Sequence, residues 1–535
     1  MINSKTKFYT FLFLYLVVFL YATRNVPLFE TTEARYAEIS REMLVSGDYI
    51  TPVFDGIKHF HKPPLSYWLI ALGMKIFGIN NFGARFFGIF FGVLSIFILF
   101  QMAKLFYDDI GDRINISLIY ASSLLFLAIL PIVSTDIYLT FFTSVSYYFL
   151  FKQIYGIKSK YNAYFYSIFL SLGFLDKGPV IFLFTILPYF IAKFFDKNHR
   201  KVFSYKEILI GTAIFFLISL PWYVVVIMKN PKLLDYFLVA QVIDRVTTNR
   251  FHRYKPFYYF FIVFFSLFLP YIFFFLKSFF KYGKIDKKIA LLIIYVLTPF
   301  FVFSIAESKL STYILPFYPI ASLIAYEGFK KFKNRYERIA TFVVLFILDI
   351  GIGASGYFYP PLNTHKFTLI LVSLFGLFLI IPVYLNMYKN TLIKHTSIFL
   401  IFIAACVYTV IPSIGPYIRG YSVMAQSINR MDPQKKLNVL VYGKSLPSIS
   451  FYRNKIAVMA YGKNRDLEFE TNNNYKKYYI DNEKDMQQFL KNNAYFFTII
   501  KTKYIAAFEK KYNLRCTKFY QQTKYGAYKC HLSKN

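Results

Sequence analysis

The chain has 535 residues, of which 56% are hydrophobic and 22% aromatic, and its mean hydropathy is +0.42. Uncharged runs such as residues 257–276 identify an integral membrane protein and exclude an ordinary soluble domain. The net charge is +34. The seven histidines and three cysteines form neither a CxxC nor an HExxH motif, so neither a structural zinc site nor a metalloprotease is indicated.

Apolar segments of about twenty residues, the length needed to cross a bilayer, recur along most of the chain. Thirteen candidates cover residues 8–22, 84–103, 115–134, 137–151, 161–175, 178–195, 207–227, 257–276, 289–305, 312–328, 339–357, 367–386 and 396–412. A further segment, 65–79, is shorter, contains Lys75 and follows two prolines, so we expect it at the membrane interface. The predicted fold class is mainly α, with about 13 membrane helices.

Basic residues alternate between the connecting loops, which predicts the orientation of the helices. If Lys5 and Lys7 are cytoplasmic, most lysines and arginines fall on that side, as in the loops 277–288 and 330–338. The basicity is therefore topological, and a nucleic-acid partner is not indicated. The first segment lacks a small-residue cleavage site, so we expect it to remain as an anchor.

The remaining polar residues gather on the opposite side of the predicted membrane. They lie in the loop 23–65, at 134–136, 176–177, 228–256 and 307–309, and in everything after residue 415. Charges at membrane ends are costly unless they are paired or hydrated, so their convergence predicts a polar cavity. Interfacial snorkelling remains the alternative for any single lysine.

The loop after the first helix carries the densest charge, in ETTEARYAEISREM from residue 30 and FHKPPLSYW from residue 60. Its charged residues at helical spacing are Glu33, Arg35, Glu38, Arg41 and Glu42. We expect some of these to form solvated intrahelical pairs, and we select only Glu33 and Arg35 as candidates for chemistry. His59, His61 and Lys62 follow, ahead of a double proline.

The tail from about Lys435 has the pattern of a small α/β domain. LNVLVYG and KIAVMAY read as strands and KSLPSISFYR as a short helix, followed by a helix at 482–493, an extended segment at 494–501, a helix at 503–511 and a terminal hairpin. We therefore predict a membrane domain at 1–415 and an extracytoplasmic domain at 416–535. Cys516 and Cys530 both fall in the second, where a disulfide is plausible.

Three classes of function remain open at this point. A transporter would be expected to show internal repeats with broken helices in matching halves, and no such symmetry is visible. Charges at one membrane face, beside an extramembrane domain, favour an enzyme whose substrates have lipid tails and polar heads. A structural scaffold is the third alternative.

The motifs resemble those of a known family. EARYAEISREMLVSGDYITP and FHKPPLSYW are similar to the opening loop of the bacterial 4-amino-4-deoxy-L-arabinose lipid A transferases and, more distantly, of the protein O-mannosyltransferases. The resemblance continues, over residues 5–330 in order, through TDIYLT around Asp136, LDKGPV around Lys177, QVIDRVTTNRFHRYKPFYYF around Arg245, and ESKLSTYILPFYP around Lys309 and Tyr313.

The resemblance implies a GT-C-type membrane glycosyltransferase. Its donor is an undecaprenyl phosphate sugar, its acceptor is lipid A or a related envelope molecule, and its active site faces the periplasm from the inner membrane. The alternatives are an enzyme similar to the protein O-mannosyltransferases, with a polyprenyl phosphate mannose donor, and a lipid-linked sugar flippase or transporter. The partners implied are these lipids and the surrounding bilayer.

The resemblance also implies roles for residues in the matching motifs. Cations must hold the departing donor phosphate, for which the candidates are Lys62, Arg35 and Arg245. A carboxylate must orient the acceptor and support the sugar, for which the candidates are Glu33, Asp136 and Glu30. The candidates for substrate binding are His61, Tyr36, Lys177, Lys309 and Tyr313. A single displacement of this kind predicts inversion at the anomeric carbon.

The chain departs from the family pattern at two carboxylates. Thr32-Glu33 stands where the arabinosyl transferases commonly have Asp-Glu, and His61 replaces the glutamate of their FEKP. Glu30 could supply the first charge and His61 could form the hydrogen bonds of the second. These two departures leave open the identity of the sugar and the presence of a divalent metal site.

Simpler roles compete at several positions. Asp136 could be a helix N-cap, and Lys177 could snorkel beside Asp176 while Gly178 ends the helix. Lys309 and Tyr313 could anchor the membrane interface. The basic residues around His252 could bind lipid headgroups, which we favour there.

Overall fold

The protein is described here by a computed structural model, which describes residues 4–30, 32–196, 199, 202–243, 254–279, 287–331, 335–386, 391–462, 466–470 and 473–533. The chain divides into two compact units. The first, which we call the helical unit, consists of Met1–Thr23, Phe87–Ile227 and Leu234–Thr409. The second, the mixed unit, consists of Arg24–Phe86, Met228–Leu233 and Val410–Asn535.

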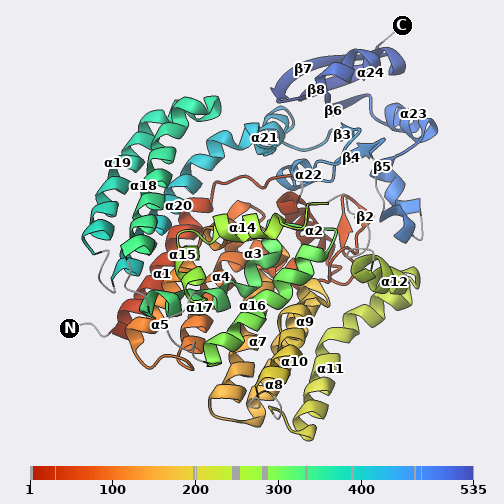
Figure 1. Cartoon of the computed structure of the whole chain (residues 1–535). Helices are drawn as coiled ribbons and strands as arrows, with labels where there is room; N and C mark the ends of the chain where they lie inside the picture. The colour runs from red at the N-terminus through yellow and green to blue at the C-terminus, as the bar shows by residue number, and fades with distance from the viewer. Residues whose placement is uncertain are drawn as a thin grey trace. The chain divides into compact units, whose positions relative to one another are not determined.

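All thirteen apolar segments are helical, and the structure is mainly α outside the C-terminal sheet (Figure 1). The unbroken helices are α1 (Ser4–Thr23), α4 (Asn81–Ala103), α7 (Thr135–Tyr155), α8 (Lys160–Lys177), α11 (Tyr205–Lys229), α16 (Lys287–Ile305), α18 (Arg335–Phe358), α19 (Lys366–Leu385) and α20 (Leu392–Ile414). Short helical pieces α12 (Lys232–Asp235), η2 (Tyr236–Ile243), η4 (Pro360–His365) and η5 (Gly415–Tyr417) connect some of them.

Four of the apolar segments are each divided into two helices. The pairs are α5 (Ile110–Ser122) with α6 (Leu124–Ile129), α9 (Val180–Phe184) with α10 (Ile186–Phe195), α14 (Tyr259–Leu267) with α15 (Ile272–Lys277), and η3 (Ser311–Phe317) with α17 (Tyr318–Lys331). Ser123 has an extended backbone between α5 and α6, and Pro270 lies in the break between α14 and α15, where a helix cannot continue its hydrogen bonds.

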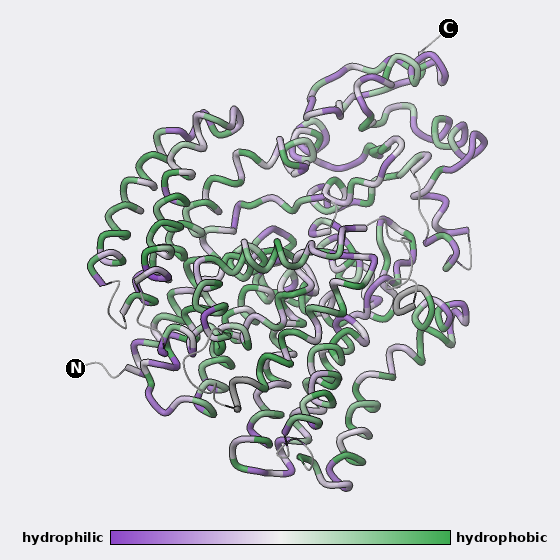
Figure 2. The backbone as a smooth tube through the Cα atoms, viewed as in Figure 1, coloured by the Kyte–Doolittle hydropathy of each residue, from purple (hydrophilic) through white to green (hydrophobic). Residues whose placement is uncertain are grey.

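The membrane assignment is confirmed at the level of several spanning helices. Six helical stretches in the described residues are long and apolar enough to cross a membrane: Ser4–Thr23, Asn81–Ala103, Tyr205–Lys229, Tyr336–Phe358, Pro360–Leu385 and Leu392–Tyr417. Figure 2 shows hydrophobic residues along most of α11, α18 and α19. The number of crossings predicted from sequence is larger; the other segments include shorter apolar helices such as Val180–Phe195 and Leu291–Ile305.

The mixed unit contains a six-stranded sheet in the order β5-β4-β3-β6-β8-β7. Its strands are β3 (Val439–Tyr442), β4 (Val458–Ala460), β5 (Tyr479–Ile480), β6 (Tyr495–Lys501), β7 (Leu514–Gln522) and β8 (Tyr525–Leu532). The first four are parallel, and β8 pairs antiparallel with both β6 and β7. The strands and the terminal hairpin predicted for the tail are therefore confirmed.

Helices cover both faces of this sheet, as the alternation of strand residues requires. They are α21 (Ser422–Met431) and α22 (Pro447–Arg453) on one face, and α23 (Glu483–Asn492) and α24 (Ile505–Tyr512) on the other, with η6 (Asp466–Phe469), η7 (Asn473–Lys477) and η8 (Thr502–Tyr504) in the connections. Val439 and Val441 pack with α21 and α22, whereas Leu440 between them packs with α23 and α24. Cys516 and Cys530 pair across β7 and β8 and form a disulfide, as the sequence suggested.

The charged loop after α1 belongs to the mixed unit and folds with the C-terminal residues. It forms α2 (Thr32–Ser46), a hairpin of β1 (Val53–Phe54) and β2 (Ile57–Lys58), and α3 (Leu65–Phe77). Asp55 and Gly56 form the hairpin turn with φ values of 50° and 77°, a conformation for which Asp-Gly is well suited. Helix α2 contacts α3, β1 and α22, so its charged face lies against protein.

Candidate active site

Helix α2 buries most of its charged side chains. Glu38 and Arg41 form a two-pronged pair, with Arg41 Nε 2.7 Å from Oε2 and Nη2 2.5 Å from Oε1 of Glu38, and they are 0% and 3% exposed. The expected intrahelical pair is therefore present, but the expectation that it is solvated is wrong. The reason is that α22 and the hairpin enclose this face of α2, and Arg41 also donates to Asn454 Oδ1 at 3.1 Å.

Glu33 is held by a cation that the sequence reasoning did not select. Arg85, at the start of α4, donates to Glu33 Oε1 at 3.0 Å and to the carbonyl oxygens of Val26 and Pro27 at 2.7 and 3.1 Å. The Phe29 N–H also donates to Glu33, at 3.2 Å. Both charged side chains are buried, so this pair fixes the chain before α2. An arginine near the start of an apolar segment is the signal that could have identified it.

Glu30 lies against the start of α22. Its Oε1 accepts from the N–H of Ser448 at 3.0 Å and from the hydroxyl at 2.5 Å, whereas Oε2 is buried and has no hydrogen-bond partner among the described residues. Burial, reinforced by nearby Asp55, raises the pKa of Glu30 to about 7. At neutral pH this carboxyl is therefore divided between its acid and its charged form, which suits proton exchange as well as structural bonding.

A cluster of three carboxyl groups, Glu38, Glu42 and Asp55, lies between α2 and the hairpin turn. Their ligand oxygens are within 4.8 Å of one another. Asp55 accepts from the hydroxyls of Ser445 and Ser450 at 2.8 and 2.7 Å, and Glu42 accepts from the Gly56 N–H at 3.2 Å. Burial and the charge of Glu38 raise the pKa of Asp55 to about 7 and raise that of Glu42, so protons or a cation must offset part of the negative charge.

Two histidines from the first loop meet an aspartate about 400 residues later in the chain. His59 Nδ1 is 2.7 Å and His61 Nε2 is 2.8 Å from the two oxygens of Asp466. Burial lowers the pKa of His59. Burial also lowers the pKa of His61 to about 3, and the neighbouring His59 and Arg35 contribute to this decrease. Although burial opposes it, the histidines lower the pKa of Asp466, so neutral rings donate to a carboxylate. The ligand atoms lie within 4.8 Å of one another, and this N/O set suits zinc or a similar metal.

Arg35, Lys62 and Tyr36 form the cationic part of the first loop. Arg35 is half-buried, and its Nε is buried without a hydrogen-bond partner. Its guanidinium lies 5.8 Å from the ring of Tyr36, which packs on Tyr67 at 5.4 Å. Lys62 is 9% exposed and adjoins His61 in the chain. An arginine without a carboxylate partner in the described part of the chain is suited to an anionic substrate group.

The second group of predicted site residues lies in the helical unit. Asp136 is in the first turn of α7, and Lys177 Nζ is 2.5 Å from its Oδ1. Ser134, and not Asp136, is the N-cap, because its hydroxyl accepts from the Asp136 N–H; the N-cap alternative is therefore wrong. Gly178, with φ of 81°, ends α8 directly after Lys177, as the sequence suggested. The turn thus presents the ammonium group to Asp136.

Tyr313 joins this pair, whereas Lys309 has a different environment. The ammonium of Lys177 lies 5.2 Å from the Tyr313 ring centroid. Lys309 is 3% exposed and donates to the carbonyl oxygens of Ala306 and Lys255 at 2.5 and 2.9 Å. Arg245 and the basic residues around His252 lie outside the described residues. The assembly of all predicted site residues around one substrate stays a prediction.

Comparison with known proteins agrees with the resemblance found in the motifs. The family model of dolichyl-phosphate-mannose-protein mannosyltransferases matches residues 4–237. An uncharacterized protein of Aquifex aeolicus is 27% identical over 84% of this chain and 88% of its own length. Undecaprenyl phosphate-alpha-4-amino-4-deoxy-L-arabinose arabinosyl transferase 2 of Proteus mirabilis is 28% identical over 68% and 69%. The corresponding transferase of Edwardsiella ictaluri is 31% identical over 56% and 55%.

Solved structures extend the likeness to the fold of nearly the whole chain. The crystal structure of ArnT from Cupriavidus metallidurans bound to undecaprenyl phosphate has a TM-score of 0.80 and 18% identity, over 97% of both chains. The same protein in the apo state has a TM-score of 0.81 and 17% identity, over 98% of both. The predicted combination of membrane helices and a C-terminal α/β part is therefore a known architecture.

Proposed function

We propose that this chain is a polyprenyl-phosphate-sugar-dependent membrane glycosyltransferase of the aminoarabinose transferase family, and that it transfers a sugar from an undecaprenyl phosphate-linked donor. The proposed acceptor is lipid A or a related envelope molecule, at the periplasmic face of the inner membrane. Similarity to undecaprenyl phosphate-alpha-4-amino-4-deoxy-L-arabinose arabinosyl transferases supports this donor. The family-like motifs in the first loop and in the helical unit support the chemistry.

The observation that carries the proposal is the environment of Arg35. The other cation of α2, Arg41, is paired with Glu38, whereas Arg35 has no ion pair among the described residues and its Nε is buried without a partner. A departing phosphate gains negative charge as the glycosidic bond breaks, and a preorganised guanidinium stabilises that charge. Lys62, in the same loop, would supply a second positive charge.

The Asp136–Lys177 pair supplies the acceptor-side groups of the proposal. A carboxylate can orient the acceptor and support positive charge on the sugar, while the ammonium group attracts an acceptor phosphate. A phosphate acceptor is already anionic at neutral pH, so it needs no strong general base. Tyr313, whose ring lies next to Lys177, would form one side of the acceptor site. A single displacement by this acceptor would invert the anomeric carbon.

Thirteen membrane crossings, with the first loop and the C-terminal part in the periplasm, complete the proposal. The bias of lysine and arginine between loops supports this orientation. The Cys516–Cys530 disulfide supports it independently, because disulfides persist in an oxidising compartment such as the periplasm.

Reconstitution of the purified protein tests the proposed reaction. Vesicles would contain the protein, lipid A and undecaprenyl phosphate carrying aminoarabinose, and mass spectrometry would follow lipid A. We expect lipid A to gain the mass of one sugar residue, with loss of the product in an Arg35→Ala variant that retains its melting temperature. Unchanged lipid A with this donor, and with the corresponding galactosamine and mannose donors, would reject the proposed acceptor.

The family-model match favours one second candidate, a protein O-mannosyltransferase-like activity. In that case a polyprenyl phosphate mannose donor would glycosylate serine or threonine in an acceptor peptide. The peptide would replace lipid A in the same vesicles. Mannosylated peptide together with unchanged lipid A would select this candidate over the first.

A further inference from the structure

A cavity of about 360 Å³ lies within the helical unit, separate from the Asp136–Lys177 pair. Helices α7, α8, α9, α10 and α11 all contribute to its lining. Helix α7 carries Asp136 in its first turn and the lining residue Leu150 fourteen positions later, which is about 21 Å along a helix. On α8 the lining residues lie between Ala163 and Leu170, whereas Lys177 is the last residue. The cavity therefore occupies the other half of these helices.

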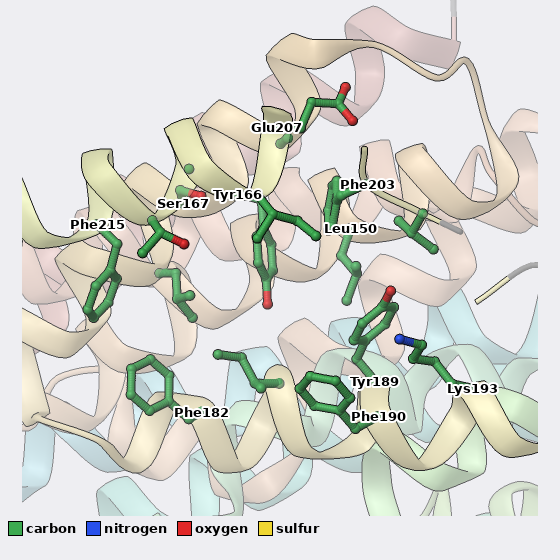
Figure 3. A pocket seen from close by; sticks show the side chains of 17 residues that line it. Leu150, Tyr166, Ser167, Phe182, Tyr189, Phe190, Lys193, Phe203, Glu207 and Phe215 are labelled. Carbon is green, nitrogen blue, oxygen red and sulfur yellow. The ribbon is translucent and has the colours of Figure 1, made fainter. Parts of the chain in front are cut away.

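The two ends of the cavity differ in chemistry (Figure 3). Phe182 and Phe215 lie at one end, and Tyr189 and Lys193 at the other. The ammonium of Lys193 is 5.6 Å from the Tyr189 ring centroid and 5.3 Å from that of Phe190. The cavity thus has an apolar interior and a cationic end, the arrangement that an amphipathic ligand with a negative head requires.

Glu207 also lines the cavity, but its carboxylate has a local partner. It accepts from the Ser204 N–H at 2.7 Å, while its own N–H donates to the Ser204 hydroxyl at 3.3 Å. This reciprocal cap fixes the start of α11. The negative charge is therefore engaged at the helix terminus, and Lys193 is the lining cation.

The cavity opens on a surface suited to contact with lipid. Phe190 and Ile208 line it and are 52% and 54% exposed. Helix α11 is long and apolar, and only 22% of its most apolar 18-residue stretch is buried. Helices α8 and α11 approach closely where they line it, since a Cβ on Gly211 would lie 2.5 Å from Ser167 Oγ. Water needs two to four polar partners in such a space, whereas a bilayer offers acyl chains directly at its mouth.

We propose that this cavity holds an acyl chain of an anionic bilayer phospholipid, whose phosphate group pairs with Lys193. Its volume lies within the usual range for small-molecule sites. Basic pockets between membrane helices commonly bind anionic lipid headgroups, and the hydroxyl of Tyr189 lies at the same end as the ammonium group (Figure 3). The occupant is a resident lipid that fills this cavity, distinct from donor and acceptor.

Native mass spectrometry of the full chain, released from vesicles of phosphatidylglycerol and phosphatidylethanolamine, tests the proposal. We expect one phosphatidylglycerol to be retained in preference to phosphatidylethanolamine. Ile208→Trp, which fills the cavity, should lower the retained fraction at least five-fold. Leu217→Trp is the matched control, because Leu217 is on the same helix, is 76% exposed and does not line the cavity.

The headgroup contact has its own test. Lys193→Gln should abolish the preference for phosphatidylglycerol while a lipid is still retained, whereas Lys160→Gln, at the start of α8 and outside the cavity, should change nothing. Thr212→Phe gives a second filling variant if Ile208→Trp lowers the melting temperature. Equal retention by the filling and control variants would overturn the proposal, as would displacement of the phospholipid by added undecaprenyl phosphate.

Discussion

The charged residues of the mixed unit and those of the helical unit differ in how they are balanced. In the mixed unit, Glu33 and Glu38 have arginine partners, Glu30 and Asp55 are bonded by serines, and Asp466 is bonded by two histidines. In the helical unit the ion pair Asp136–Lys177 stands beside Tyr313, while pairs such as Lys277–Glu337 and Lys330–Asp112 join different helices. Dense charge in the first loop therefore serves mainly to hold α2 in place.

This difference narrows the choice of chemical groups. A residue already bonded on both oxygens by protein contributes structure, whereas one with an unpartnered buried atom can still accept a substrate. By this criterion the charged or titratable residues of the first loop that stand out are Glu30, Arg35, Glu42 and His59. Glu33, Glu38 and Arg41 do not, because their polar atoms are bonded by protein. The comparison predicts that variants of the first loop will separate into those that unfold the protein and those that only slow the reaction.

The largest effect is expected from Arg85→Met. It leaves the buried carboxylate of Glu33 without its cation, and breaking a buried pair in this way costs about 3–5 kcal/mol of stability. Thermal unfolding in detergent would measure it. The double variant Arg85→Met/Glu33→Gln should recover much of the loss, because no unpaired charge remains. A single variant as stable as the native protein would show that the pair does not hold this loop.

Arg35→Ala should instead act on the reaction. Removing a preorganised donor from a developing anion typically lowers kcat by about 100- to 1,000-fold, while the melting temperature should stay within a few degrees because Arg35 has no ion pair to break in the described structure. Arg35→Lys should restore part of the rate. Arg24→Ala, an exposed arginine earlier in the same loop, is the control. Equal loss of activity in both variants would argue for a general electrostatic effect.

The sequence was sufficient for most of the helices and for the tail, because these depend on local patterns. Alternating apolar residues around Leu440 and the spacing of the helix at 482–493 predict the observed sheet and its helices. It did not predict the partners of the first loop. Ser448, Ser450 and Asp466 are about 400 residues from Glu30, Asp55 and His59 and carry no local signal of their role. The same missing contacts explain why some charged pairs of α2 were expected to be solvated.

Asp55→Asn should change how stability depends on pH. The folded state raises the pKa of Asp55 to about 7, chiefly by burial, so the stabilisation is complete below about pH 4 and is lost as the pH rises through 7. The asparagine variant lacks this loss. Its free energy of unfolding relative to the native protein should therefore rise by on the order of 2 kcal/mol between pH 5 and pH 8, and its relative melting temperature should rise with it. Asp481→Asn, an exposed change on the same unit, should show no such trend; a flat difference for Asp55→Asn would mean that a bound cation keeps the cluster ionised.

The smallest expected effect is that of Asp136→Asn on kcat. This variant is informative because it distinguishes a phosphate acceptor from a hydroxyl acceptor. A phosphate acceptor needs the carboxylate only for orientation, so we expect about a ten-fold decrease in kcat, or about 1.4 kcal/mol in the activation free energy. A hydroxyl acceptor would need it as a base, and activity would then be nearly abolished. The Lys177→Gln variant supplies the control, since loss of the ammonium group should raise KM for a phosphate-bearing acceptor but leave a neutral peptide acceptor unaffected. A ten-fold loss in Asp136→Asn, together with a KM effect in Lys177→Gln, would assign the ion pair to a phosphate.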